Sequence, residues 1–267
     1  GLAADAVLKP GETFRRAMAT ARGAAGMLED INAEQIIDPI AAMASGLSRR
    51  LDHCSVPMQA LRHARKELDA TINDLVLTAV SGAVGRYHVH RGHHTEELRA
   101  MVPMSLRTND ERSTLGNRVG MLNIKLPIAE SDPLRRLELI QGRTGAAKRD
   151  RRGALYPFLM RAMVLSPGFV FREFVRQMTT KVNLICTNIP GTPDLRYYSG
   201  QPVERIIPYA PIMERCPISV ALLSYRDHLE VGIALDPEAI PDHDKFRLHL
   251  SDAFAEVLSL AGPPKRK

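Results

Sequence analysis

The chain has 267 residues, of which 45% are hydrophobic and 25% are charged, a composition typical of a globular protein with one large domain or two small ones. It contains no Trp and only 5% aromatic residues, so few side chains could stack on bases, and we expect no nucleic-acid partner. Its net charge of +6 favours other anionic partners, such as a lipid surface or a phosphorylated ligand. No apolar run is long enough to span a bilayer and no secretory signal opens the chain, so we expect a cytoplasmic protein.

The first residues differ from the rest of the chain. Residues 1–45 show weak apolar periodicity, and Pro10 and Pro39 interrupt it. We interpret this part as a linker or arm that lies against another body. A single domain over residues 46–267 is expected to follow it.

The most regular pattern in the chain predicts a helix over residues 71–87. Its apolar residues recur at spacings of three and four, which places them in one stripe along the helix. Thr71 is a suitable N-cap, and Asp74 stands three residues later, where the acid of a capping box belongs. This helix is therefore expected to be a central element of the core.

Histidines cluster just after this pattern, at His88, His90, His93 and His94. One hypothesis is a metal site, because imidazole is a common metal ligand. The other is a polar helix end, where cationic side chains are favoured and Gly92 stops the helix. No cysteine or carboxylate stands at a recognisable ligand spacing, so we expect no metal.

The remaining elements alternate between strands and helices. Pro127 predicts a strand end or an edge strand, and Ser131-Asp132-Pro133 predicts a helix start. Arg226-Asp227-His228 lies between two apolar runs and predicts a hairpin. The predicted strands cover 51–58, 98–106, 122–128, 183–189, 217–225 and 229–235, and the predicted helices cover 59–68, 133–149, 157–178 and a last one opened by Asp242.

The three cysteines, Cys54, Cys186 and Cys216, are far apart in the sequence and odd in number. Free thiols are therefore expected rather than a disulfide framework. None of them has a local signature of a nucleophile, and Cys54 and Cys186 lie in apolar runs typical of a core.

Four short motifs carry a resemblance to a known family. Residues 71–77 read Thr-Ile-Asn-Asp-Leu-Val-Leu, residues 102–103 read Val-Pro, residues 116–118 read Gly-Asn-Arg, and residues 187–191 read Thr-Asn-Ile-Pro-Gly. In this order they resemble the C-terminal half of the bacterial wax ester synthase/diacylglycerol acyltransferase (WS/DGAT) family, within the chloramphenicol-acetyltransferase-like superfamily. The resemblance covers roughly residues 46–260.

The resemblance implies a fold and a reaction. The expected fold is α/β, with a mixed, mostly antiparallel sheet and packed helices, as in the C-terminal domain of coenzyme A-dependent acyltransferases. The expected function is the C-terminal portion of an O-acyltransferase that makes triacylglycerol or wax ester from acyl-CoA and a diacylglycerol or long-chain alcohol. Acyl-CoA is a co-substrate, and no other cofactor is implied. The basic surface and the tail Lys265-Arg266-Lys267 would suit an anionic membrane or lipid droplet.

The family's catalytic base belongs to a motif that this sequence does not match. That motif is His-His-x-x-x-Asp-Gly, in which the second histidine deprotonates the attacking alcohol. The sequence has one His-His pair, His93-His94, and Leu98 and Arg99 stand where the motif requires Asp and Gly. No catalytic residue is therefore expected in this chain. The base is expected on an N-terminal half, in the same or a separate chain, which the arm at residues 1–45 would join.

The resemblance assigns supporting roles, rather than catalytic ones, to residues of this chain. Asn73 and Asp74 match the family's Asn-Asp motif and are expected to support the active site, with a purely structural cap as the alternative. Asn188 is expected in the wall of the substrate tunnel. Arg118 is expected either to meet coenzyme A phosphate or to brace the core. A non-catalytic lipid-binding or interaction protein that retains the fold is the alternative function.

Overall fold

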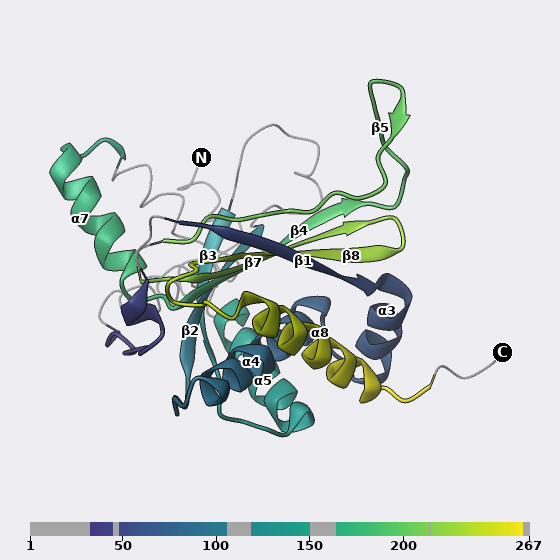
Figure 1. Ribbon diagram of the computed structural model, residues 1–267, viewed down its shortest axis with the longest axis horizontal. Helices are drawn as coiled ribbons and strands as arrows, with labels where there is room; N and C mark the ends of the chain where they lie inside the picture. Colours follow the sequence, from purple (N-terminus) through teal and green to yellow (C-terminus); the bar gives the residue numbers. More distant parts are fainter. Residues whose placement is uncertain (1–32, 45–47, 106–118, 150–163, 214, 264–267) are drawn as a thin grey trace, which may run out of the picture.

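The computed structural model describes residues 33–44, 48–105, 119–149, 164–213 and 215–263. These residues form a sheet with a layer of helices on one face (Figure 1). The elements in chain order are η1 Ala41–Met43, β1 Arg50–Pro57, α3 Met58–Glu67, α4 Ile72–His90, β2 Leu98–Ser105, β3 Val119–Leu126, α5 Pro133–Arg149, α7 Gly168–Thr179, β4 Leu184–Thr192, β5 Tyr197–Tyr198, β6 Gln201–Pro202, β7 Ile218–Tyr225, β8 His228–Leu235 and α8 His243–Ser259. Across the described residues, no helix has the length and apolar character to cross a bilayer.

The main sheet has its strands in the order β1-β8-β7-β4-β2-β3. The pairs β7–β4 and β4–β2 are parallel, and the pairs β1–β8, β8–β7 and β2–β3 are antiparallel. The expected mixed, mostly antiparallel sheet is therefore confirmed. The hairpin predicted around residues 226–228 is β7–β8, and β3 is an edge strand that ends just before Pro127.

The long helix α4 begins where the sequence predicts. Thr71 Oγ1 accepts the N–H of Asp74 at 3.2 Å, and Asp74 Oδ2 accepts the N–H of Thr71 at 2.9 Å, which completes the capping box. The prediction of one apolar stripe is wrong, because every residue from Asp74 to Gly85 is buried. The reason is that α4 packs against α5, α8 and the sheet, so the small residues between the larger apolar ones are also covered.

Two glycines allow the close packing around α4. A Cβ at Gly85 would overlap the carbonyl oxygen of Ile128, and one at Gly82 would overlap the guanidinium of Arg136. Arg136 is buried and donates to the carbonyl oxygens of Glu130 and Ser131, at 2.9 and 3.0 Å. The segment between β3 and α5 is therefore fixed directly against α4.

The part of the predicted arm that the structure describes, residues 33–44, packs on this domain. Ile40 is fully buried in the core between sheet and helices. The carbonyl oxygen of Glu34 accepts from Arg99 at 3.2 Å, and that of Ile36 accepts from Asn183 at 3.1 Å. Residues 1–32 and the tail 265–267 lie outside the described residues, so the division at residue 45 stays a prediction.

The helix predicted over residues 157–178 differs in its limits. Residues 157–163 lie outside the described part, and α7 runs from Gly168 to Thr179. Pro167 is the N-cap of this helix, and because proline has no N–H and disfavours helical backbone in the residue before it, a helix cannot run through this position unbroken. In Figure 1, α7 lies beyond the end of the sheet, away from the layer of α3, α4, α5 and α8.

Candidate functional site

Two of the predicted site residues meet in the structure. Asn188 Nδ2 donates to Asn73 Oδ1 at 2.7 Å, although the two residues are 115 positions apart. Asn73 lies in the first turn of α4, and Asn188 lies in β4 near the middle of the sheet, and both side chains are half-buried. The structure thus joins the Asn-Asp motif to the Asn-Ile-Pro-Gly motif at the N-terminus of the central helix.

Asp74 has the contacts of a structural cap. Besides its capping-box bonds, its Oδ2 accepts from Thr71 Oγ1 at 2.6 Å, and its Oδ1 accepts from Thr144 Oγ1 at 2.7 Å. Asp74 and Thr144 are both buried. Thr144 could not be predicted as a partner, because no local pattern connects this residue of α5 to the start of α4. These contacts favour the structural interpretation of Asp74, while its neighbour Asn73 presents its amide to Asn188.

The Pro-Gly pair after Asn188 fixes the end of β4 against β7. The register of the two strands shifts between Ile189 and Thr192. Gly191 donates its N–H to Ser224 Oγ at 3.1 Å, and a Cβ at Gly191 would overlap the carbonyl oxygen of Ser224. Glycine is therefore required at this motif position by the close approach of the two backbones. Arg118, the other predicted site residue, lies outside the described residues.

The histidines at the end of α4 do not form one cluster. His88 is buried, its Nε2 3.1 Å from Asp38 Oδ1, so the expectation of a polar helix end is wrong for this residue. The reason is that residues 33–44 cover this side of α4. His90 points elsewhere, with its Nε2 3.6 Å from Asp242 Oδ2. Within the described ranges, no group of three or more His, Cys, Asp or Glu side chains is placed to hold a metal ion.

The three thiols are unsuited to nucleophilic chemistry near neutral pH. Burial raises the pKa of Cys54 to about 11 and the pKa values of Cys186 and Cys216 to about 12. A thiol attacks as its thiolate, which is scarce at pH 7 when the pKa lies this high. The three cysteines are free thiols in the structure, as predicted.

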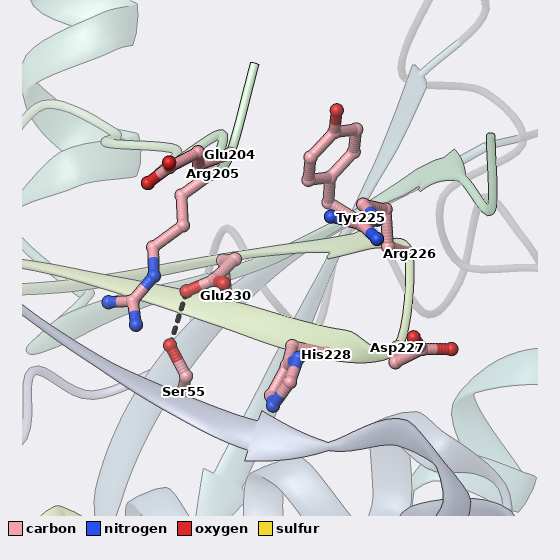
Figure 2. A pocket seen from close by; sticks show the side chains of 8 residues that line it. All are labelled: Ser55, Glu204, Arg205, Tyr225, Arg226, Asp227, His228 and Glu230. Atoms are coloured by element: carbon pink, nitrogen blue, oxygen red, sulfur yellow. Dashed lines mark hydrogen bonds between the residues drawn. The ribbon is translucent and has the colours of Figure 1, made fainter. Parts of the chain in front are cut away.

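A second polar feature, which the sequence analysis did not predict, lies on the other face of the sheet (Figure 2). A pocket of about 250 Å³ is lined by β1, the β7–β8 hairpin and residues 204–205. At its floor, Ser55 Oγ donates to the buried Glu230 at 2.5 Å, and Figure 2 shows Arg205 extending toward this pair. Glu230 is in register with Leu223, whereas Asn188 is in register with Leu222, so the two polar features lie on opposite faces.

Comparison with known proteins identifies a family that the chain matches. The family model described as the WS/DGAT C-terminal domain matches residues 115–257. The chain is 29% identical over 241 residues to the probable diacylglycerol O-acyltransferase tgs1 of Mycobacterium tuberculosis, an alignment that covers 85% of this chain and 51% of that protein. It is also 29% identical over 209 residues to the O-acyltransferase WSD of Acinetobacter baylyi, covering 77% of this chain and 45% of that protein. The chain therefore spans about half the length of the curated relatives it matches.

Solved structures share the fold. The wax ester synthase/diacylglycerol acyltransferase from Marinobacter aquaeolei VT8 matches with a TM-score of 0.65 and 21% identity, covering 90% of this chain and 57% of that chain. A structure described as the basis for condensation domain-mediated chain release from the enacyloxin polyketide synthase matches with a TM-score of 0.57 and 18% identity, covering 82% of this chain and 43% of that chain. The expected α/β fold is thus confirmed as one that acyltransferases and condensation domains share.

Proposed function

Because the chain belongs to the wax ester synthase/diacylglycerol acyltransferase family, we propose that it is the C-terminal portion of an enzyme that acylates a lipid alcohol. The acyl donor is acyl-CoA, and the acceptor is a diacylglycerol or a long-chain alcohol, so the product is triacylglycerol or wax ester. The names of the relatives from M. tuberculosis and A. baylyi support O-acyl transfer. The proposed location is the cytoplasm, at the surface of an anionic membrane or lipid droplet.

The reaction exchanges a thioester for an oxygen ester. The alcohol oxygen attacks the carbonyl carbon of the thioester, a C–O bond forms, the C–S bond breaks, and coenzyme A leaves as its thiol. A general base accepts the alcohol proton and passes a proton to the departing sulfur, a contribution of roughly 10²–10⁴-fold. We propose that this base is the second histidine of His-His-x-x-x-Asp-Gly on an N-terminal half that packs on this domain. No metal or prosthetic group takes part in this proposal.

The contact between Asn73 and Asn188 is the observation that carries the proposal for this chain. The hydrogen bond uses one N–H of Asn188 and the oxygen of Asn73. The Asn73 NH₂ group and the Asn188 oxygen keep their capacity for further hydrogen bonds. We propose that this amide pair forms part of the tunnel wall, where Asn188 orients Asn73 and the cap at Asp74 fixes the start of α4. Arg118 is proposed to contact coenzyme A phosphate.

The alternative is a non-catalytic lipid-binding or interaction protein that retains the fold. The observation that favours it is that Leu98 and Arg99 occupy the motif positions after the sequence's His-His pair. Under this alternative, lipid binding persists whereas acyl transfer is absent with any companion segment.

The test measures acyl-CoA-dependent transfer by residues 1–267 alone and together with an N-terminal half that bears the motif. We expect no transfer by the chain alone and transfer by the joined protein. Turnover of acyl-CoA and an alcohol by the chain alone would overturn the proposed companion and direct attention to His93 and His94. Failure of the joined protein to transfer, with lipid binding intact, would support the alternative.

A further inference from the structure

Three large apolar side chains are exposed within a short stretch of sequence, two just before α7 and one in its first turn. Val164, Leu165 and Phe169 are 69%, 82% and 75% exposed, and we call these three residues the α7 tip. Figure 1 shows α7 beyond the end of the sheet, away from the layer of α3, α4, α5 and α8. Soluble surfaces rarely gather such residues without a partner, and a group of them marks a contact site.

The α7 tip is separate from the half-buried side of α7. Val170, Phe171 and Phe174, spaced by one and three residues, are half-buried. Phe169 lies on the other side of the helix, where Arg172 and Arg176 follow it at i+3 and i+7. The exposed side of α7 thus combines an aromatic ring with two guanidinium groups.

The charges on this side distinguish a lipid surface from an apolar protein partner. Arg172 and Arg176 are exposed, and Arg176 pairs with Glu173 at 2.6 Å. For Arg172, the structure shows no ion pair with any residue it describes. Apolar side chains flanked by arginine suit an anionic bilayer, because the rings enter the acyl boundary while the guanidinium groups remain at the phosphates.

We propose that the α7 tip inserts into an anionic lipid surface and anchors this domain there, with Arg172 at the headgroups. The inference deepens the proposed function, on which it rests for its biological purpose, because diacylglycerols and long-chain alcohols reside in lipid rather than in water. The contact itself involves no acyl transfer, so it can be tested independently of turnover.

The absence of Trp from the whole chain permits a direct test. A Phe169→Trp variant carries a single indole at the α7 tip, and Tyr198→Trp carries one on β5, an exposed site on the far side of the molecule in Figure 1. Each full chain is mixed with vesicles of phosphatidylcholine containing phosphatidylserine, with or without brominated acyl chains. We expect a blue shift and quenching for the indole at position 169, and neither for the indole at position 198.

Binding is measured in parallel by vesicle sedimentation. The Leu165→Ser/Phe169→Ser double variant should bind roughly tenfold or more weakly, since two large apolar groups leave the lipid. Arg172→Gln should bind about fivefold more weakly to anionic vesicles and equally to pure phosphatidylcholine. Leu248→Ser, at an exposed leucine of α8, is the matched control and should bind normally. Thermal melting of each variant establishes that it is folded.

The outcomes separate this inference from the proposed function. Sedimentation with vesicles while the indole at position 169 stays in water would overturn the inference, as would unchanged binding of the double variant. A blue shift that depends on protein concentration without lipid would assign the α7 tip to a second copy and also overturn it. Lipid insertion by the chain, together with no acyl transfer by the joined protein, would support the inference while counting against the proposed enzyme.

Discussion

His88 and Asp38 form a buried pair that ties the segment before β1 to the central helix. His88 Nε2 lies 3.1 Å from Asp38 Oδ1, and the other ring nitrogen, Nδ1, lies 2.8 Å from the carbonyl oxygen of Val84. That carbonyl can only accept, so Nδ1 donates and Nε2 faces the carboxylate. Asp38 Oδ1 also accepts the N–H of Ile40 at 2.9 Å, which fixes the turn that buries Ile40 in the core.

Removing either member of this pair should destabilise the domain strongly. We expect His88→Ala and Asp38→Ala each to lower the free energy of unfolding by about 3–5 kcal/mol, because the remaining polar group is left buried without its partner. The double variant should lose less than the two single losses added together. Urea unfolding measures all three, with the exposed His90→Ala as the control. Additive losses would contradict a direct interaction.

Substitutions at the two residues of the Asn-Asp motif should have different effects, one on stability and the other on activity. Asp74→Ala should lower the free energy of unfolding by roughly 1–3 kcal/mol, because it removes the cap and the shorter of the two hydrogen bonds that Thr144 Oγ1 donates. Asn73→Ala should melt nearly normally and lower acyl transfer in the joined enzyme, and Asn188→Ala should reproduce that loss. Melting and turnover are measured for each variant. If Asn73→Ala unfolds the protein and leaves specific activity intact, the proposed role of the amide pair is wrong.

Close packing at Gly85 gives a prediction with a matched control. Gly85→Ala places a Cβ against the carbonyl oxygen of Ile128 and should destabilise the protein by about 1–3 kcal/mol, since backbone must shift. Gly142 is an exposed position of α5 with open space around it, so Gly142→Ala should instead stabilise the protein by roughly 0.5–1 kcal/mol through helix propensity. Thermal melting distinguishes the two. Equal effects of both substitutions would contradict the packing of residue 128 on α4.

The buried thiol of Cys186 should make the protein less stable in alkali. Its pKa is about 12 in the folded protein, against an ordinary 9.0. Between these values the unfolded chain binds fewer protons than the native one, so the free energy of unfolding falls as pH rises. From pH 8 to pH 10 the loss should be about 1 kcal/mol greater for the natural protein than for Cys186→Ala, which lacks this thiol. Urea unfolding under reducing conditions at both pH values measures the difference, and identical losses would argue against a buried thiol.

Local signals in the sequence were sufficient for many individual elements. The capping box at Thr71 and Asp74, the β7–β8 hairpin and the end of β3 before Pro127 all follow from residues within four positions of one another. The family motifs also indicated Asn73 and Asn188 separately. Such features are predictable because neighbouring residues determine caps, turns and strand ends.

Only the tertiary structure decided which distant residues meet. The order β1-β8-β7-β4-β2-β3 brings β4 to the middle of the sheet, and this arrangement places Asn188 within hydrogen-bonding distance of Asn73. Packing of α4 on several sides buried the residues between its predicted apolar positions, and residues 33–44 covered His88. These outcomes depend on contacts between segments 50 to 115 residues apart, which periodicity along one segment does not encode. The sequence by itself determined the elements and the family motifs, and long-range packing determined the amide pair, the buried histidine and the exposed tip of α7.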